Sequence, residues 1–226
     1  MKVTLKIGGF LFPRELDPLL IGMYARELNR LHDKGHRLLV ITGGGEVARR
    51  YIDEARRLGA SEGLCDVIGI QVSRLNASLI LSSLDERAYP CVPTSFEEAL
   101  SFTASGRIVV SGGLQPGQST NAVAALLAEA IKADLLINLT DVDGVFTEDP
   151  KLNPAAKKLE EVTVTQMIEL VSGKSIVAGG YKLLDPIALR VIGRSRIPTK
   201  IVNGREVSNL ERAIKGEAVG TRIVPE

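Results

Sequence analysis

The chain of 226 residues carries 28 Lys and Arg against 27 Asp and Glu, which gives a formal net charge of +1. A protein that binds nucleic acid through phosphate contacts normally has a clear basic excess, and this chain has none. Charged residues make up 24% of the chain and apolar residues 45%, a balance typical of a soluble globular domain and unlike a disordered chain.

Short β-rich runs alternate with longer segments of helical periodicity up to about residue 140. This alternation is typical of a parallel sheet flanked by helices. The continuous apolar run at 38–41 suits a strand that is buried on both faces. We predict strands at 3–7, 37–42, 88–92, 108–111 and 135–140, and helices at 16–31, 46–58, 66–84 and 119–131.

The remainder of the chain has a more mixed pattern, with turn signals at Asp143-Gly144 and Asp149-Pro150. Helices are predicted at 165–171 and 186–194, a strand at 199–202, and an edge strand at 221–224. No low-complexity linker or internal repeat separates the two parts. We therefore expect one domain over 1–226, with a continuous sheet shared by an N-terminal acceptor half and a C-terminal half.

Cysteine and histidine are scarce in this sequence. Cys65 and Cys91 have no CxxC spacing, and the only histidines are His32 and His36, which argues against a zinc site and for a reduced compartment. No stretch of about 18 residues is free of charge, and the N-terminus lacks the apolar core of a signal peptide. We expect a cytoplasmic protein with no membrane or nucleic-acid partner.

Glycine-rich turns follow three of the predicted strands, at Gly8-Gly9, at Gly43 to Gly45, and at Gly112-Gly113 with Gly117. Glycine lets the backbone approach an anion closely, and exposed N–H groups then bind phosphate oxygens. Ligands in open α/β sheets gather at the carboxyl ends of the strands. One such turn is weak evidence, whereas three in succession favour a ligand rich in phosphate.

The third turn partly matches a P-loop, because Gly112, Gly117 and Ser119 have the required spacing. Position 118 is Gln where a P-loop needs the lysine that neutralises the β- and γ-phosphates, so we reject a P-loop ATPase. The amides of the turn and the hydroxyls of Ser119 and Thr120 remain candidate phosphate ligands. Either hydroxyl also suits a helix N-cap, and the two roles are compatible.

Charged side chains near these turns are candidates for phosphoryl transfer, in which positioning and charge neutralisation dominate. Lys6 lies two residues before Gly8, either at a solvated strand end or aimed at the ligand. Asp143 follows a predicted buried strand, where it forms a simple turn or orients that lysine. Arg49 and Arg74 are candidate phosphate ligands, although most helical arginines are merely solvated.

Taken together, these motifs resemble the amino acid kinase superfamily and, within it, the archaeal-type uridylate (UMP) kinases. The similarity covers essentially the whole chain in order, and its motifs are specific in combination. They are Lys6-Ile7-Gly8-Gly9, Thr42-Gly43-Gly44-Gly45, Ala48-Arg49-Arg50-Tyr51-Ile52, Asp66-Val67-Ile68-Gly69-Ile70, Arg74-Leu75-Asn76-Ala77, the 112–120 turn followed by Ala122-Val123-Ala124-Ala125, and Asp141-Val142-Asp143-Gly144-Val145.

The resemblance implies a three-layer αβα fold that transfers the γ-phosphoryl group of ATP, with Mg²⁺, to UMP in pyrimidine nucleotide biosynthesis. About 1–135 would then bind the acceptor and about 136–226 would bind ATP, in a homohexamer built from dimers. Lys6 and Asp143 would be the catalytic pair. The residues implied for ATP are Gly8, Gly9, Phe10, Gly45, Arg49, Thr140, Asp141, Phe146 and Asp149, and those implied for UMP are Gly44, Asp66, Leu114, Gln115, Pro116, Gly117, Gln118, Ser119 and Thr120.

Three positions depart from the commoner pattern of these kinases. Phe10 stands where many relatives have Ser, Asp141 replaces a frequent Asn, and Phe146 replaces a frequent Tyr. No dedicated protein metal site is expected, because ATP would carry the Mg²⁺.

Two alternatives keep the same fold. One is a kinase for another acceptor, namely acetylglutamate, carbamate or isopentenyl phosphate. The other is a nucleotide or oxyanion binder without activity. The isopentenyl phosphate enzymes use a histidine near the acceptor turn, whereas both histidines of this chain precede Gly43. The filled lysine and aspartate positions count against an inactive binder.

Overall fold

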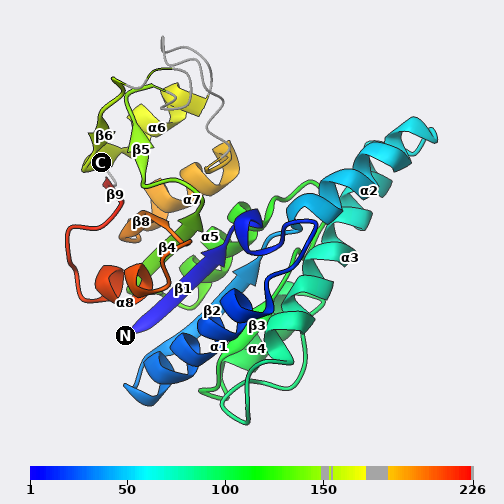
Figure 1. Ribbon diagram of the computed structural model, residues 1–226, viewed down its shortest axis with the longest axis horizontal. Coiled ribbons are helices and arrows are strands. Elements are labelled where there is room, and N and C mark those ends of the chain that lie inside the picture. Colours follow the sequence, from blue (N-terminus) through cyan, green and yellow to red (C-terminus); the bar gives the residue numbers. More distant parts are fainter. Residues whose placement is uncertain (149–152, 154, 172–182, 225–226) are drawn as a thin grey trace.

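The computed structural model describes residues 1–148, 153, 155–171 and 183–224 (Figure 1). A seven-stranded sheet runs through this part of the chain in the order β3-β2-β1-β4-β8-β9-β7. All its strand pairs are parallel except β8 with β9. The strands are β1 (Lys2–Ile7), β2 (Arg37–Thr42), β3 (Val109–Ser111), β4 (Leu135–Thr140), β7 (Glu161–Thr163), β8 (Thr199–Asn203) and β9 (Thr221–Val224), and a separate antiparallel pair is β5 (Val145–Phe146) with β6 (Lys158–Leu159).

Helices cover both faces of the sheet, which makes the three-layer αβα arrangement expected from the sequence. Buried side chains of β1 and β2 alternate between the two layers. Leu5 and Val40 pack with α1, α3 and α8, and Leu39 and Ile41 pack with α4 to α7. The helices are η1 (Gly9–Leu11), α1 (Pro18–Asp33), α2 (Gly45–Arg57), α3 (Glu62–Leu81), α4 (Phe96–Thr103), α5 (Thr120–Ala130), α6 (Val164–Val171), α7 (Pro186–Ser195) and α8 (Ser208–Ile214).

Local sequence signals explain where several helices begin. Asp17 accepts hydrogen bonds from the backbone N–H groups of Leu19 and Leu20, and Pro18 occupies the first helical position of α1. Ser61, Ser95, Ser119 and Asp185 cap α3, α4, α5 and α7 in the same way. Helices α2 and α3 lie side by side and project beyond the sheet (Figure 1).

The structure corrects two of the predicted strands. Residues 88–92 do not form a strand, and Ala88 makes only an isolated bridge with Ile108. The 221–224 strand is not at an edge, because β9 lies between β8 and β7. The sequence analysis also missed η1, α4, α8 and the short strands β5, β6 and β7.

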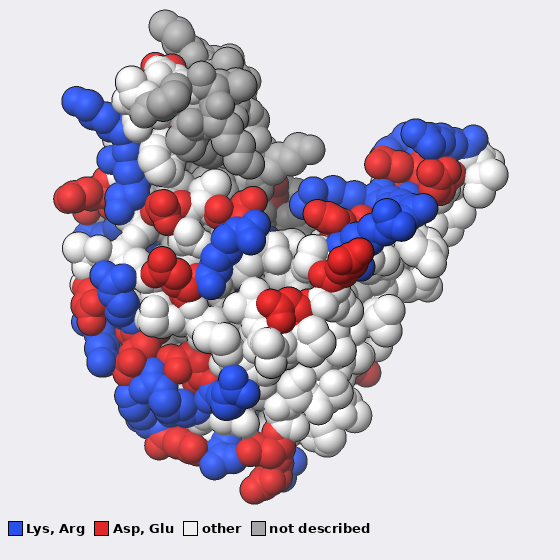
Figure 2. Space-filling model, in the orientation of Figure 1, with Lys and Arg blue, Asp and Glu red and all other residues white. Residues whose placement is uncertain are grey.

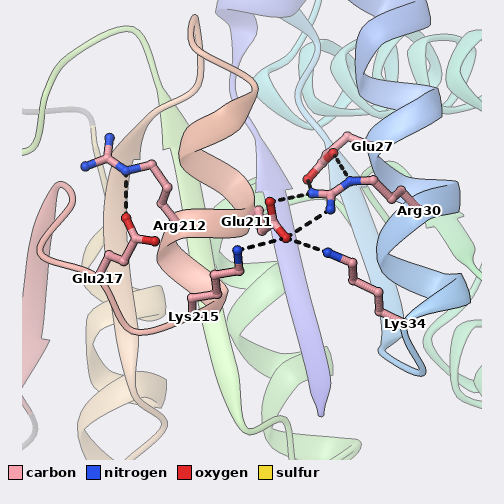
Figure 3. Close-up of polar contacts among 7 residues, drawn as sticks. All are labelled: Glu27, Arg30, Lys34, Glu211, Arg212, Lys215 and Glu217. Carbon is pink, nitrogen blue, oxygen red and sulfur yellow. Dashed lines mark hydrogen bonds and ion pairs between the residues drawn. The ribbon is translucent and has the colours of Figure 1, made fainter.

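An ion-pair cluster joins α1 to α8, which are the first and last α-helices among the described residues (Figure 3). Glu211 accepts hydrogen bonds from Arg30 and Lys34, with Nη1···Oε1 and Nζ···Oε1 distances of 2.9 and 2.6 Å. These hydrogen bonds, together with one from Lys215, lower the pKa of the Glu211 carboxyl. Figure 2 shows charged side chains on the side that carries α8 and along the arm of α2, with a largely uncharged surface between them.

Candidate active site

A pocket of about 280 Å³ lies where the carboxyl ends of β1, β2 and β3 meet the helices that follow them. It brings together segments that are far apart in the sequence, as the three glycine turns predicted. The predicted site residues that line it are Lys6, Gly9, Gly44, Gly45, Arg49, Asp66, Gln118, Ser119 and Thr120, together with Gly43 and Gly113 from the turns.

Glycine is required where the first two turns pack against each other. Gly45 has φ +66°, and a Cβ there would overlap the carbonyl oxygen of Phe12. A Cβ on Gly9 would lie 3.1 Å from the Cα of Gly45 and 3.3 Å from Nη2 of Arg49. The backbones of the two turns therefore approach each other closely and leave Arg49 beside them at the pocket.

Lys6 is half-buried in β1 and lines the pocket from the face of the sheet that α5 and α7 cover. Burial and, to a smaller extent, the nearby positive charge of Arg49 lower the pKa of its ammonium, the negative charge of Asp185 partly opposes them, and the net pKa is about 8. In the part of the chain that the structure describes, Lys6 has no hydrogen-bond or ion-pair partner. Its ammonium is therefore available to a bound phosphate.

Asp185 is a site residue that the sequence analysis missed. One carboxylate oxygen caps α7 by accepting hydrogen bonds from the N–H groups of Ile187 and Ala188. The other accepts a short hydrogen bond from Oγ of Ser119, which itself caps α5. The Asp185-Pro186 pair signals a helix start in the sequence, but no local pattern shows that its second oxygen reaches Ser119.

Asp66 on α3 holds the turn that leads into α5. Its Oδ2 accepts a hydrogen bond of 2.8 Å from the N–H of Gly117, which has φ +79°. Two segments predicted to bind the same ligand are thus in direct contact. The residues Leu114, Gln115 and Pro116 face a neighbouring pocket of about 410 Å³, which Gln118 also lines.

Arg74 supports the backbone at the end of β3. Its guanidinium donates to the carbonyl oxygens of Gly113, Thr94 and Leu114 at 2.9, 2.7 and 3.3 Å. Because these contacts occupy both Nε and Nη2, the side chain acts as a brace for the 113–114 backbone. Arg74, which the sequence marks as a candidate phosphate ligand, therefore supports the backbone of the site in this structure.

The remaining predicted nucleotide residues lie at the end of β4, beside the end of β1. Gly8 donates its N–H to the carbonyl oxygen of Leu139, and a Cβ on Gly8 would lie 3.6 Å from the Cα of Thr140. Asp141 is exposed and Phe146 is half-buried. Asp149 lies outside the described residues.

Asp143 contacts a neighbouring side chain other than Lys6. Its Oδ1 accepts a hydrogen bond of 2.7 Å from Nδ2 of Asn203 at the end of β8. The carboxylate whose charge acts on Lys6 is that of Asp185. In this structure Asp143 therefore makes no direct contact with Lys6 that would support its predicted role in orienting the lysine.

Phe10 is turned away from the pocket. Its ring packs on Tyr24, with centroids 6.2 Å apart, and the Tyr24 hydroxyl donates to the carbonyl oxygen of Gly204 at 2.5 Å. Only the backbone of the Phe10 turn is therefore placed to meet a phosphate.

A divalent cation would depend on the ligand for most of its coordination. Among the described residues, no three His, Cys, Asp or Glu side chains gather as a metal site. Asp141 is exposed beside the site, and one or two carboxylates with phosphate oxygens and waters are the usual donors to Mg²⁺. The residues present thus fit a cation that arrives with a polyphosphate.

The fold and the pocket define an enzyme that binds phosphorylated ligands. A half-buried lysine, an arginine, close-packed backbone amides and two helix N-termini converge on one rim, where they neutralise negative charge. The sequence profile of the amino acid kinase family matches residues 1–203, and the chain belongs to this family.

Proteins named uridylate kinase are similar to this chain over its full length. The uridylate kinase of Methanothermobacter thermautotrophicus is 49% identical over 226 residues, which is 100% of both chains. That of Methanobrevibacter smithii is 46% identical over 99% of both. The crystal structure of uridylate kinase from Archaeoglobus fulgidus has a TM-score of 0.87 at 42% identity, covering 99% of this chain and 100% of the other.

Proposed function

We propose that the protein is a UMP kinase that transfers the γ-phosphoryl group of ATP to UMP, giving UDP and ADP, in pyrimidine nucleotide biosynthesis. The observation that carries the choice of substrate is the identity of 49% to a uridylate kinase over the full length of both chains. The pocket supports it, because members of the residue sets expected for both nucleotides line it.

In this reaction an ionised oxygen of the UMP phosphate attacks the γ-phosphorus of ATP, and ADP leaves on the opposite side. The phosphate of UMP is already ionised near neutral pH, so no general base is needed. Lys6 and Arg49 would neutralise the charge that spreads over the transferring oxygens. Asp185 would keep Lys6 in place and would hold the Ser119 hydroxyl at the start of α5.

The two nucleotides would use adjacent parts of the rim. ATP would lie on Gly8, Gly9, the Phe10 backbone, Gly45 and Arg49 and extend to 140–149, with Mg²⁺ between its phosphates. UMP would lie on Gly44, Asp66 and the 114–120 turn. This division assigns the acceptor to about 1–135 and ATP to about 136–226, while the Gly8–Phe10 turn, Gly45 and Arg49 of the first half would contact the ATP phosphates.

We further propose a cytoplasmic homohexamer built from dimers. The long helix α3 exposes the apolar side chains of Leu64 and Leu75, with 51% and 67% of their surface accessible, which suits a contact between copies of the chain. By length and composition α3 alone is apolar enough to cross a membrane, considering the described helices. Its residues Ala77 and Ile80 are fully buried in the core, as in the helices of water-soluble enzymes.

Acceptor assays test this proposal directly. Formation of ADP from ATP is measured with UMP, acetylglutamate, carbamate and isopentenyl phosphate as separate acceptors. We expect turnover with UMP and none of comparable rate with the others. Turnover with another acceptor but not with UMP would overturn the assignment, and ATP binding without turnover on any acceptor would favour a binder.

Asp66→Asn refines the assignment of the UMP side of the rim. The substitution keeps the shape of the side chain but removes its charge, so it weakens the acceptor for ribose hydroxyls and for the N–H of Gly117. We expect the KM for UMP to rise by roughly tenfold with little change in the KM for ATP. A change confined to ATP would contradict the assignment.

A further inference from the structure

A second pocket lies at the amino ends of the parallel strands, at the opposite end of the sheet from the candidate active site. Its volume is about 430 Å³, and its charged lining residues are Lys2, Arg37, Arg107 and Lys132. Half-buried Leu100 and Ile131 add an apolar wall, and no acidic side chain is among the described residues that line it. A cavity of this size is in the range of small-ligand sites.

The topology of the sheet places these four cations in a row. Lys2 is the first residue of β1 and Arg37 is the first residue of β2, while Arg107 and Lys132 shortly precede β3 and β4. These strands are neighbours in the order β3-β2-β1-β4, and all are parallel. Because adjacent strands are about 4.8 Å apart, the strand starts span about 14 Å along one edge.

Three of these cations form no ion pair with an acidic side chain in the part of the chain that the structure describes. Arg37, Arg107 and Lys132 are exposed, and in the described part of the chain none has an acidic side chain within ion-pair distance. Lys2 donates from Nζ to the carbonyl oxygen of Ile131 at 2.9 Å, which fixes its ammonium at the rim.

Nearby negative charge does not balance this row. The C-termini of α4 and α5 reach the pocket, and each contributes roughly half a negative charge. Asp134 adds one more, with its Oδ2 accepting the backbone N–H of Lys2 at 2.7 Å. Against four cations, these charges leave a surplus of about two positive charges at the pocket.

Lys132 occupies a backbone position that normally favours glycine. It has φ +52° directly after α5, and the following N–H of Ala133 donates back to the carbonyl oxygen of Ala128. This is the helix ending in which glycine is usual, because a Cβ in the left-handed region costs about 1 kcal/mol. The chain thus accepts backbone strain at a position whose lysine side chain adds positive charge to the pocket.

We propose that this pocket, which we call the rear pocket, binds a phosphorylated small molecule that carries two or more phosphates and an apolar or aromatic group. The row of cations would bind the phosphates, and Leu100 and Ile131 would contact the apolar group. The site is separate from the candidate active site, because Lys2 and Lys6 lie four residues apart along β1, about 13 Å. It does not depend on the proposed UMP kinase activity.

Binding is tested on the full chain at about 50 mM salt, where weak electrostatic contacts are least screened. The probes are inorganic tripolyphosphate and the non-hydrolysable ATP analogue AMP-PNP. Equilibrium dialysis gives the number of bound molecules per chain, and amide hydrogen exchange shows which segments they protect. We expect one molecule of AMP-PNP per chain in addition to any that the candidate active site binds, and added protection at 102–108 and 130–134.

Two substitutions remove cations from the rear pocket, and a third substitution, outside the pocket, serves as a control. Arg37→Glu reverses a charge, while Lys132→Gly removes one and also relieves the backbone, so the latter variant is expected to fold well. Each should weaken the second binding event by roughly tenfold or more, as expected for the loss of a charge-assisted contact. Arg26→Glu on α1 makes the same charge change as Arg37→Glu at an exposed site away from the pocket.

The outcomes separate two forms of the proposal from its failure. Binding of both probes at the rear pocket means that the phosphates suffice, and binding of AMP-PNP alone means that the apolar wall is also needed. The proposal is overturned if neither probe protects 102–108 and 130–134. It is equally overturned if the pocket variants bind as wild type, or if Arg26→Glu weakens the second event as much as Arg37→Glu does.

Discussion

Raising the pH through about 8 is expected to reduce the activity of this protein by discharging Lys6. Burial and the charge of Arg49 lower the pKa of Lys6 to about 8, and the charge of Asp185 only partly opposes them. With this pKa, about nine tenths of the free protein carries the ammonium at pH 7 and about one tenth at pH 9. If transfer needs the charged form, kcat/KM for ATP should fall roughly tenfold between these values.

The assay is ADP formation in quenched samples, since coupling enzymes have pH profiles of their own. The UMP phosphate titrates near pH 6 and is already about nine tenths ionised at pH 7, so it adds little change, and that change is in the opposite direction. Lys6→Arg is the matched variant: its guanidinium stays charged, and its lower kcat/KM should be flat from pH 7 to 9. A flat wild-type profile, or an equal fall in Lys6→Arg, would refute the assigned role of the Lys6 charge.

Three further predictions concern catalysis and stability. Lys6→Ala should lower kcat by roughly 10²–10³, with circular dichroism confirming the fold; near-full turnover would contradict a catalytic role. Lys6→Met should raise the free energy of unfolding without nucleotide by up to about 3 kcal/mol at pH 7, because a lysine with a pKa of about 8 resists charging when folded. That gain should fade between pH 8 and 10.5, and urea titrations at several pH values will show whether it does. Gly45→Ala should cost more than about 2 kcal/mol, because its Cβ would overlap the Phe12 carbonyl at φ +66°. Gly59→Ala, at φ +86° with open space around it, should cost only about 1 kcal/mol in the same titrations, and equal costs would show that the overlap is unimportant.

The central part of the fold could be predicted because its signals are local. Residues 37–42 and 135–140 form the strands that their sequence predicts, with the same bounds. The convergence of the glycine turns could be predicted as well, because the carboxyl ends of neighbouring parallel strands lie at the same end of the sheet.

The missed elements lacked strong periodic patterns. α4 is only eight residues long, although Ser95 and Glu98 give it a capping signal that could have revealed it. α8 has no side-chain cap. The position of β9 inside the sheet was not predictable, because a strand's own sequence does not identify its neighbours.

The candidate site shows the same limit. Lys6 and the turns could be found from the residues beside them, whereas the link between Asp185 and Ser119 joins positions 66 residues apart. Arg74 looks like a phosphate ligand in the sequence, yet its guanidinium is directed to backbone carbonyls. Both facts depend on tertiary contacts that no spacing pattern encodes.

The place of β1 between β2 and β4 has a consequence for synthesis on the ribosome. β1 can pair with β2 as soon as the first 42 residues have emerged, but its other edge waits for β4 at 135–140. During that interval an apolar strand edge stays open to other chains, and closing it requires a contact of long sequence separation, which slows folding. We therefore expect nascent chains that end before residue 135 to aggregate, and chains extended past β4 to become resistant to proteases while still attached.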